Sequence, residues 1–188
     1  LGGAAMLRTM NDILRDALQA ERASVFRYDA GRHELLTVVA HGDAEQSDSS
    51  PLIRMNADDG LAGAALGLDR MLNIMDAYED ERFNPDFDQK TGFRTRSVLC
   101  FPLHDEHGAP IGIAQVLNRT HGHFTAESEI IAGQLATRCA HALNNAFFQE
   151  PDAVNLVATI VADSLVLPSL DETIIITEAK TAAPIIVP

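Results

Sequence analysis

The sequence predicts an α+β domain in which an antiparallel sheet of six strands carries both terminal helices on one face and a long excursion on the other. Three observations favour this fold class. Helical apolar periodicity marks both ends of the first 150 residues. Short runs rich in β-branched and aromatic residues lie between these ends and are separated by turn residues. A chain of 188 residues that is 46% hydrophobic can fill one core of this kind.

The first expected element is an amphipathic helix over residues 4–20, where Met6, Met10 and Leu14 recur at helical spacing among polar residues. Two strand-like runs follow, "ASVFRYD" at 23–29 and "ELLTVVAH" at 34–41. The short, glycine-containing connection between them is typical of a hairpin. The run "LIRM" then predicts a short strand after a polar loop.

The middle of the chain predicts a helix, a strand and an excursion. "DDGLAGAAL" at 58–66 places acidic residues before small helix-forming ones, which favours a helix start. "MLNIM" at 71–75 indicates another strand. Residues 76–92 are polar, contain Pro85 and predict a long excursion with one short helix. Long excursions in compact domains often carry function.

Residues 96–119 pair two strong apolar runs around a turn marked by Gly108 and Pro110, which predicts the central hairpin of the sheet. Residues 125–149 form the closing helix, with Glu127 in its first turn. We therefore expect one domain over residues 1–150. In the tail, "AVNLVATIVADSLVL" fits a helix or a strand, and "ETIIITEAKTAAPIIVP" is β-branched with two prolines. We interpret residues 151–188 as a linker, a vector-derived tail or the start of a neighbouring segment.

Charge and composition narrow the classes of function. With 27 acidic against 14 basic residues the net charge is −13, which disfavours nucleic acid and anionic membranes as partners. The sequence contains no run of 18 apolar residues, so we expect no membrane insertion. The chain begins with leucine and has no leader, so we interpret it as a piece of a longer polypeptide. Twelve arginines against two lysines suggest a GC-rich bacterial source.

Cysteines and histidines offer little chemistry. Cys100 and Cys139 provide neither a disulfide framework nor a metal-ligand spacing, which fits a reducing cytoplasm. The "HDEH" and "HGH" clusters fall in predicted turns without a third ligand, so we expect no metal site. Cys100 lies among valine, leucine and phenylalanine, where its pKa should be raised and its thiol inert.

A distinctive series of motifs lies between residues 58 and 119: "GLAG", "LNIMDAY", "RFNP" and "TGFRTRSVLCFP", closed by Asn118 and Arg119. On these motifs the sequence closely resembles the GAF domains of cyclic-nucleotide phosphodiesterases and of related bacterial adenylyl cyclases. Looser similarity extends from about residue 4 to about residue 149 and leaves the tail outside.

The resemblance implies the six-stranded sheet and, under a long lid segment on the face opposite the helices, a pocket for cyclic AMP or cyclic GMP, with no other cofactor required. Phe93 would stack on the purine, and the hydroxyls of Thr91 and Thr95 would lie nearby. The other positions implied as ligand-binding are Ser24, Leu61, Ala62, Asn84, Asp88 and Gln115. The residues themselves leave other roles open. Phe93 also suits an aromatic packed under the excursion without a ligand, and Thr91 and Thr95 suit a strand edge. Asp88 and Asn84 also suit turns, and Arg94 and Arg96 suit a solvated strand face.

Physical chemistry makes such a pocket reasonable. A purine needs an aromatic platform and a few neutral hydrogen-bonding groups, which "TGFRT" supplies within five residues. A cyclic phosphate needs local positive potential that a chain of net charge −13 does not provide overall. We expect main-chain amides at the helix starts in "DDGLAG" and "FNPDF" to provide it instead of basic side chains.

The sequence departs from the family at a dispersed Asn-Lys, Phe, Asp-Glu motif that supports the pocket. The matching positions here are Asn118, Arg119, Phe124, Ser128 and Glu129. Serine replaces the aspartate, so the family's ion pair cannot form, and Glu127 or Glu129 is left as the substitute partner of Arg119. Ala40 and His41 stand where some members have a phenylalanine–aspartate pair near the base.

Together these features predict a regulatory sensor domain with no catalytic residues of its own. Binding of a cyclic nucleotide would shift the terminal helices, which are also the expected surfaces of a homodimer, and so control an attached output domain. The alternative is a dimerisation scaffold that kept the fold and lost the ligand. A more remote alternative is a small redox enzyme that uses Cys100.

Overall fold

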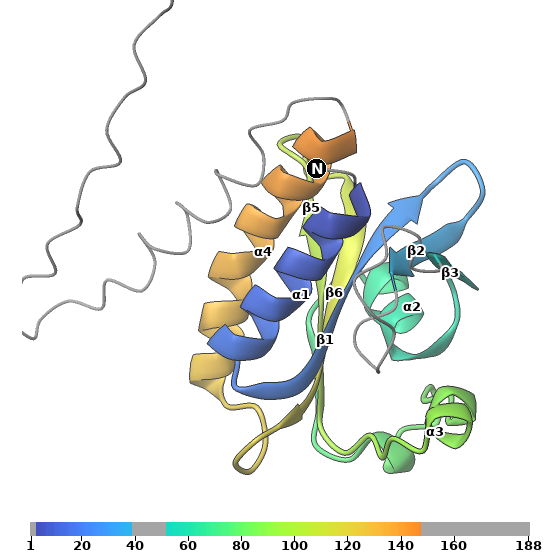
Figure 1. Cartoon of the computed structure of the whole chain (residues 1–188), viewed down its shortest axis with the longest axis vertical. Helices are drawn as coiled ribbons and strands as arrows, with labels where there is room; N and C mark the ends of the chain where they lie inside the picture. Colours follow the sequence, from blue (N-terminus) through green and yellow to red (C-terminus); the bar gives the residue numbers. More distant parts are fainter. Residues whose placement is uncertain (1–2, 39–51, 148–188) are drawn as a thin grey trace, which may run out of the picture.

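The computed structural model describes residues 3–38 and 52–147. Within them a six-stranded sheet has the order β3-β2-β1-β6-β5-β4, with every neighbouring pair antiparallel (Figure 1). The elements are α1 (Gly3–Ala17), β1 (Ala20–Asp29), β2 (Glu34–Val38), β3 (Leu52–Asn56), α2 (Gly60–Gly67), β4 (Leu72–Ile74), the 3₁₀ helix η1 (Ala77–Glu79), α3 (Asp86–Thr91), β5 (Val98–His104), β6 (Pro110–Arg119) and α4 (Ala126–Phe147). The predicted fold class is confirmed in its sheet and helices.

Helices α1 and α4 lie side by side on one face of the sheet (Figure 1). The apolar stripe of α1 places Met6, Met10 and Leu14 in contact with the sheet, where each is almost completely buried. A buried polar bond also fixes this helix, because the backbone N–H of Val25 donates to Oδ1 of Asn11 at 2.7 Å. The predicted positions of both helices relative to the sheet are therefore confirmed.

The opposite face of the sheet carries α2. Strand alternation turns Val25 toward α1 and α4 and the next residue, Phe26, toward α2. Leu61 and Ala65 of α2 pack in the same cluster as Phe26. Gly63 permits this approach, since a Cβ there would lie 2.5 Å from the backbone carbon of Asp58. The side chains of β1 thus belong alternately to two different cores.

The excursion between β4 and β5 contains two short helices, η1 and α3, whereas the sequence predicts one. Asp76 begins η1 by accepting a hydrogen bond from the backbone N–H of Tyr78 at 3.0 Å. Helix α3 ends at Gly92, whose φ of 69° lies in the left-handed region that favours glycine. The rings of Tyr78 and Phe83 lie 5.0 Å apart and give the excursion a small apolar centre of its own.

The centre of the sheet corrects one expectation. Residues 96–119 were expected to form the central hairpin, but β5 lies outside the central pair, which is β1 with β6. In that pair Ala20 opposes Arg119 and Arg27 opposes Gly112. Pairing between strands so distant in sequence leaves no local signal in either strand. As the two central strands, β1 and β6 contribute side chains to the cores on both faces of the sheet.

Some expectations fall outside the described residues. These are the polar loop after β2, the Ala40–His41 pair and residues 151–188, so the domain boundary near residue 150 stays a prediction. In the part that the structure describes, no helix is both long enough and apolar enough to cross a membrane.

Candidate functional site

A cavity of about 340 Å³ lies between the sheet, α2 and the excursion. Its floor is made by cross-strand neighbours of β1 and β6: Arg22 opposite Leu117, and Ser24 opposite Gln115. Arg22, Ser24 and Phe26 of β1 reach this side because strand side chains alternate between faces. Ser24 and Gln115 place neutral hydrogen-bonding groups next to each other on this floor.

The start of α2 forms one wall of the cavity. Gly60, Leu61 and Ala62 all line it, and the side chain of Asp59 makes no capping hydrogen bond to the helix. The first amides of an α-helix have no partner within the helix, and they carry the positive end of its dipole. Gly60 has a φ of 66°, which a glycine adopts without strain. This wall suits an anion.

The excursion forms the opposite wall, with Phe83, Asn84, Phe87 and Asp88 among its lining residues. Oδ1 of Asn84 accepts a hydrogen bond from the backbone N–H of Asp86 at 2.9 Å. Asn84 therefore organises the start of α3, as its alternative role as a turn residue implied, and it also borders the cavity.

Asp88 fastens α3 to the chain that leads into β5. It is only 5% exposed. Its Oδ2 accepts hydrogen bonds from the backbone N–H of Thr95 at 2.7 Å and from the hydroxyl of Tyr78 at 3.1 Å. Its Oδ1 accepts from Oγ1 of Thr95 at 2.8 Å. Asp88 and Thr95 both line the cavity, and their mutual bonds hold its outer wall in place.

Seven of the nine positions proposed to bind ligand line this one cavity; Thr91 and Phe93 do not. Oγ1 of Thr91 donates to the carbonyl of Phe87 within α3 at 2.9 Å. The ring of Phe93 is covered by the guanidinium of Arg22, whose Cζ lies 3.9 Å from the ring centroid. The seven that line the cavity are Ser24, Leu61, Ala62, Asn84, Asp88, Thr95 and Gln115.

Sequence reasoning missed two basic side chains, Arg22 and Lys90, that line the cavity. The expectation that main-chain amides alone supply positive potential is therefore too narrow. Strand alternation contained the signal for Arg22, because it lies two residues before Ser24 and must share its face. Lys90 lies in the last turn of α3, and its side of that helix could not be read from six residues.

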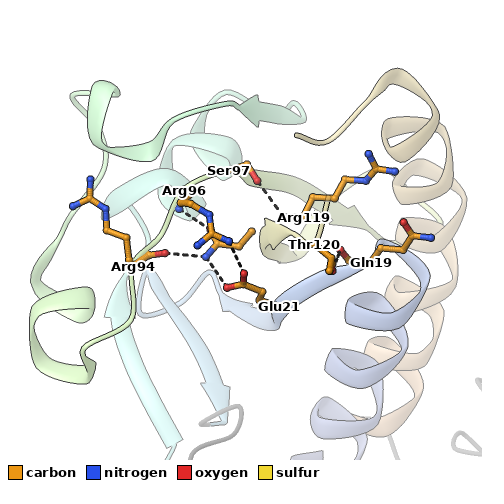
Figure 2. A network of polar contacts seen from close by, with 8 residues as sticks. Gln19, Glu21, Arg94, Arg96, Ser97, Arg119 and Thr120 are labelled. Atoms are coloured by element: carbon orange, nitrogen blue, oxygen red, sulfur yellow. Dashed lines mark hydrogen bonds and ion pairs between the residues drawn. The ribbon is translucent and has the colours of Figure 1, made fainter. Parts of the chain in front are cut away.

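A polar cluster joins the start of β1, the end of β6 and the segment before β5 (Figure 2). Asn118, fully buried with a φ of 57°, is at its centre. Its Nδ2 donates to Oε2 of Glu21 at 2.9 Å and to the carbonyl of Arg94 at 2.8 Å, and its Oδ1 accepts from the backbone N–H of Arg96 at 2.6 Å. Arg96 and Glu21 form an ion pair at 2.5 Å.

The pKa of Glu21 is lowered by its position in this cluster. Partial burial raises its pKa, but hydrogen bonds from Asn118 and Arg96, together with the nearby positive charges, lower the pKa overall below its ordinary value. Arg94 and Arg96 are exposed, as expected for a solvated face, yet both have partners. The guanidinium of Arg94 lies 3.7 Å from the ring centroid of Tyr78.

The expected substitute ion pair of Arg119 is not formed in the part of the chain that the structure describes. Arg119 donates to the carbonyls of His121 and His123, both at 3.2 Å. Glu129 instead accepts from Nδ2 of Asn73 at 2.7 Å. The expectation was wrong because nearer main-chain acceptors satisfy the arginine.

Two further motif positions, Phe124 and Ser128, have structural roles on the side of the sheet that the terminal helices cover. Phe124 is buried in the core under α1 and α4. Oγ of Ser128 accepts from the backbone N–H of Thr125 at 3.1 Å. Serine at this position therefore organises the first turn of α4, where the family's aspartate would form an ion pair.

The cysteines give the redox alternative no support. Cys100 is completely buried, and burial raises the pKa of its thiol well above the ordinary range. Burial likewise raises the pKa of Cys139 to about 12. Among the described residues no group of three or more His, Cys, Asp or Glu side chains could hold a metal ion.

Fold and cavity together define the class: an α+β domain with its terminal helices on one face of an antiparallel sheet and a walled cavity on the other. The particular family follows from comparison with known proteins. The GAF domain model matches residues 4–143, and the chain belongs to the GAF domain family.

Two curated relatives are phosphodiesterases. The chain is 35% identical over 150 residues to "Probable 3',5'-cyclic phosphodiesterase pde-5" of Caenorhabditis elegans, a match that covers 76% of the chain and 20% of that protein. It is 33% identical over 124 residues to "Dual 3',5'-cyclic-AMP and -GMP phosphodiesterase 11" of Drosophila melanogaster, covering 65% of the chain and 8% of that protein. Both are animal proteins, so a bacterial source and the likeness to adenylyl cyclases stay predictions.

A solved structure agrees in fold. The GAF domain of Acinetobacter phosphoenolpyruvate-protein phosphotransferase superimposes with a TM-score of 0.60 at 17% identity, covering 88% of each chain. The likeness at this identity concerns the fold alone. The chain thus corresponds to a regulatory domain and spans only a small part of the curated relatives that it matches.

Proposed function

We propose that this chain is a regulatory sensor domain that binds a cyclic nucleotide in its cavity and signals the occupancy to an attached output domain. The observation that carries the proposal is the cavity of about 340 Å³, in which an uncapped helix start faces neutral hydrogen-bonding groups. Small-molecule sites usually measure about 300–1,000 Å³. The phosphodiesterase relatives make a cyclic nucleotide the natural first ligand to test.

The cyclic phosphate would lie at the start of α2. A net charge of −13 repels an anion at long range, so local positive groups must compensate. The free amides at Gly60 and Leu61 and the side chains of Arg22 and Lys90 all border the cavity and could do so. Two exposed carboxylates, Asp59 and Asp86, also border the cavity, and solvent weakens their repulsion as it weakens the attraction of the exposed Lys90.

The base would lie over the sheet floor. Ser24 and Gln115 offer a hydroxyl and an amide to a purine edge, and Thr95 adds a hydroxyl from the outer wall. Phe93 would provide the stacking surface once the guanidinium of Arg22 moves from its ring. Thr91, bonded within α3, would act on the ligand only through the position of that helix.

Occupancy would reach the terminal helices through the polar cluster of Figure 2. The segment before β5 follows the excursion, and through Asn118 it is bonded to Glu21, four residues after the end of α1. Asn118 is also the penultimate residue of β6, the strand that leads to α4. We propose that α1 and α4 form a homodimer surface in the cytoplasm and extend this signal to the output domain. The catalysis of any parent enzyme would belong to that other domain.

Calorimetric titration of the chain with cyclic AMP and cyclic GMP tests the proposal. We expect saturable binding of at least one nucleotide at one site per chain. A Phe93→Ala variant should lose most of the nucleotide-induced rise in melting temperature, because the stacking surface is removed. Met75→Ala, which truncates an exposed side chain, should behave as wild type.

The ligand-free scaffold is the competing function. The contact between Arg22 and Phe93 favours it, since the chain already covers the ring that a ligand would need. Absence of heat with both nucleotides, from a chain that unfolds cooperatively, would support the scaffold and exclude the sensor.

A further inference from the structure

Arg22 has an unusual position, between two cavities. Its side chain lines the large cavity on the floor of the sheet, opposite Leu117. It also lines a smaller cavity of about 90 Å³ beside α1, together with Asn11 and Arg15. Protein interiors are generally close-packed. Arg22 therefore borders open volume in two cavities, so its side chain has space beside it into which it could turn.

In the structure this guanidinium lies over the ring of Phe93, with Cζ 3.9 Å from the centroid. Arg22 takes part in none of the ion pairs found among the described residues. Its neighbour Glu21 is engaged by Arg96 and Asn118, and the buried carboxylate of Asp88 is engaged by Thr95 and Tyr78. The guanidinium of Arg22 thus contacts an aromatic face, while its charge also helps to lower the pKa of the neighbouring Glu21.

An anion is a stronger partner for a guanidinium than an aromatic face. Cation–π contacts at partly exposed sites are weak, whereas charge-assisted hydrogen bonds to phosphate are strong and directional. A ligand with an anionic group thus offers Arg22 a reason to leave Phe93. A neutral ligand offers none and has to compete with Arg22 for the same ring.

We propose that Arg22 is an anion-selecting gate, which covers Phe93 when the cavity is empty and turns to the ligand when an anionic group enters. The inference rests on the proposed function and assigns the selection of the ligand's anionic group to Arg22. Arg22 is then a specificity-determining residue that excludes the corresponding neutral nucleosides. Lys90 also borders the cavity, but it is exposed and its charge is screened.

The test compares anionic and neutral ligands on the full 188-residue chain. Affinities for cyclic AMP, cyclic GMP, adenosine and guanosine are measured by calorimetry for the wild type, Arg22→Gln and Arg22→Met. Both substitutions remove the charge, and the second keeps an unbranched side chain in case the first does not fold. Arg94→Gln is the matched control, because Arg94 also lies over an aromatic ring but does not line the cavity.

Loss of a charge-assisted contact predicts that cyclic-nucleotide affinity falls about 10- to 100-fold in the Arg22 variants. Nucleoside affinity should stay constant or rise, since Phe93 is uncovered. Arg94→Gln should keep the wild-type ratio. An equal loss for both ligand classes, or no loss, overturns the gate while the sensor stands. A wild type that binds none of the four overturns the sensor itself.

Discussion

Asp88 offers a quantitative test of how the outer wall of the cavity is held. It is buried and accepts three hydrogen bonds, two from Thr95 and one from Tyr78. Hydrogen bonds to a charged group contribute about 1.5–3 kcal/mol each, and a buried donor left unpaired adds a penalty. The expected loss is smaller than the sum of three such bonds, because the Tyr78 bond is the longest and water can reach groups of the exposed excursion. We therefore expect Asp88→Ala to lower the free energy of unfolding by about 3–5 kcal/mol.

Two further variants separate charge from shape. In Asp88→Asn the amide oxygen can accept from the backbone N–H of Thr95 and from Tyr78, and the amide nitrogen can donate to the hydroxyl of Thr95. Only the charge is lost, so we expect a decrease of about 1–2 kcal/mol. Asp86→Ala, in the first turn of the same helix, removes an exposed carboxylate and should cost about 0.3–1 kcal/mol.

Urea unfolding followed by circular dichroism measures the global stability of each variant. Native-state hydrogen exchange over residues 86–97 measures the excursion itself, which can open without unfolding the sheet. Faster exchange in that segment for Asp88→Ala, but not for Asp86→Ala, is the expected pattern. If Asp88→Ala matched Asp86→Ala in both measurements, the proposed fastening role of Asp88 would be wrong.

The other predictions concern packing, acid stability and thiol reactivity. Gly112→Ala should destabilise the domain by about 1–3 kcal/mol, because its Cβ would collide with the carbonyl of Phe26, whereas Gly133→Ala in the open middle of α4 should stabilise it by up to about 1 kcal/mol; equal urea midpoints would refute this. The lowered pKa of Glu21 means that its stabilising contribution is present above its unfolded-state pKa and disappears as pH falls through the folded-state pKa. The urea midpoints of wild type and Glu21→Gln should therefore converge between pH 7 and pH 3, and a constant gap would contradict the mechanism. Cys100 and Cys139 should react with Ellman's reagent only after unfolding, and rapid labelling of the native chain would show that they are accessible.

The elements with strong local patterns could be predicted from sequence. The stripe of Met6, Met10 and Leu14 identifies α1, because only a helix brings these residues onto one face. The apolar runs on either side of Gly108 identify β5 and β6. Of the nine ligand-binding positions implied by the family motifs, seven line one cavity.

The rest depended on contacts between distant segments. The pairing of β1 with β6 has no local signature in the sequence. The sequence likewise does not show that Arg119 donates to main-chain carbonyls instead of pairing with Glu129. Strand alternation places Arg22 on the face of Ser24, but its contact with Phe93 joins segments that are distant in sequence and has no local signature. Periodicity identifies faces, whereas a cavity is made where several faces meet.

A crystal structure of the chain grown with saturating cyclic AMP or cyclic GMP tests the central claim most directly. We expect a nucleotide between α2 and the sheet floor, with its phosphate at the amides of Gly60 and Leu61, its base on Phe93 and the guanidinium of Arg22 turned toward the phosphate. A cavity that stays empty or is filled by the protein's own side chains, with Arg22 still over Phe93, would contradict it.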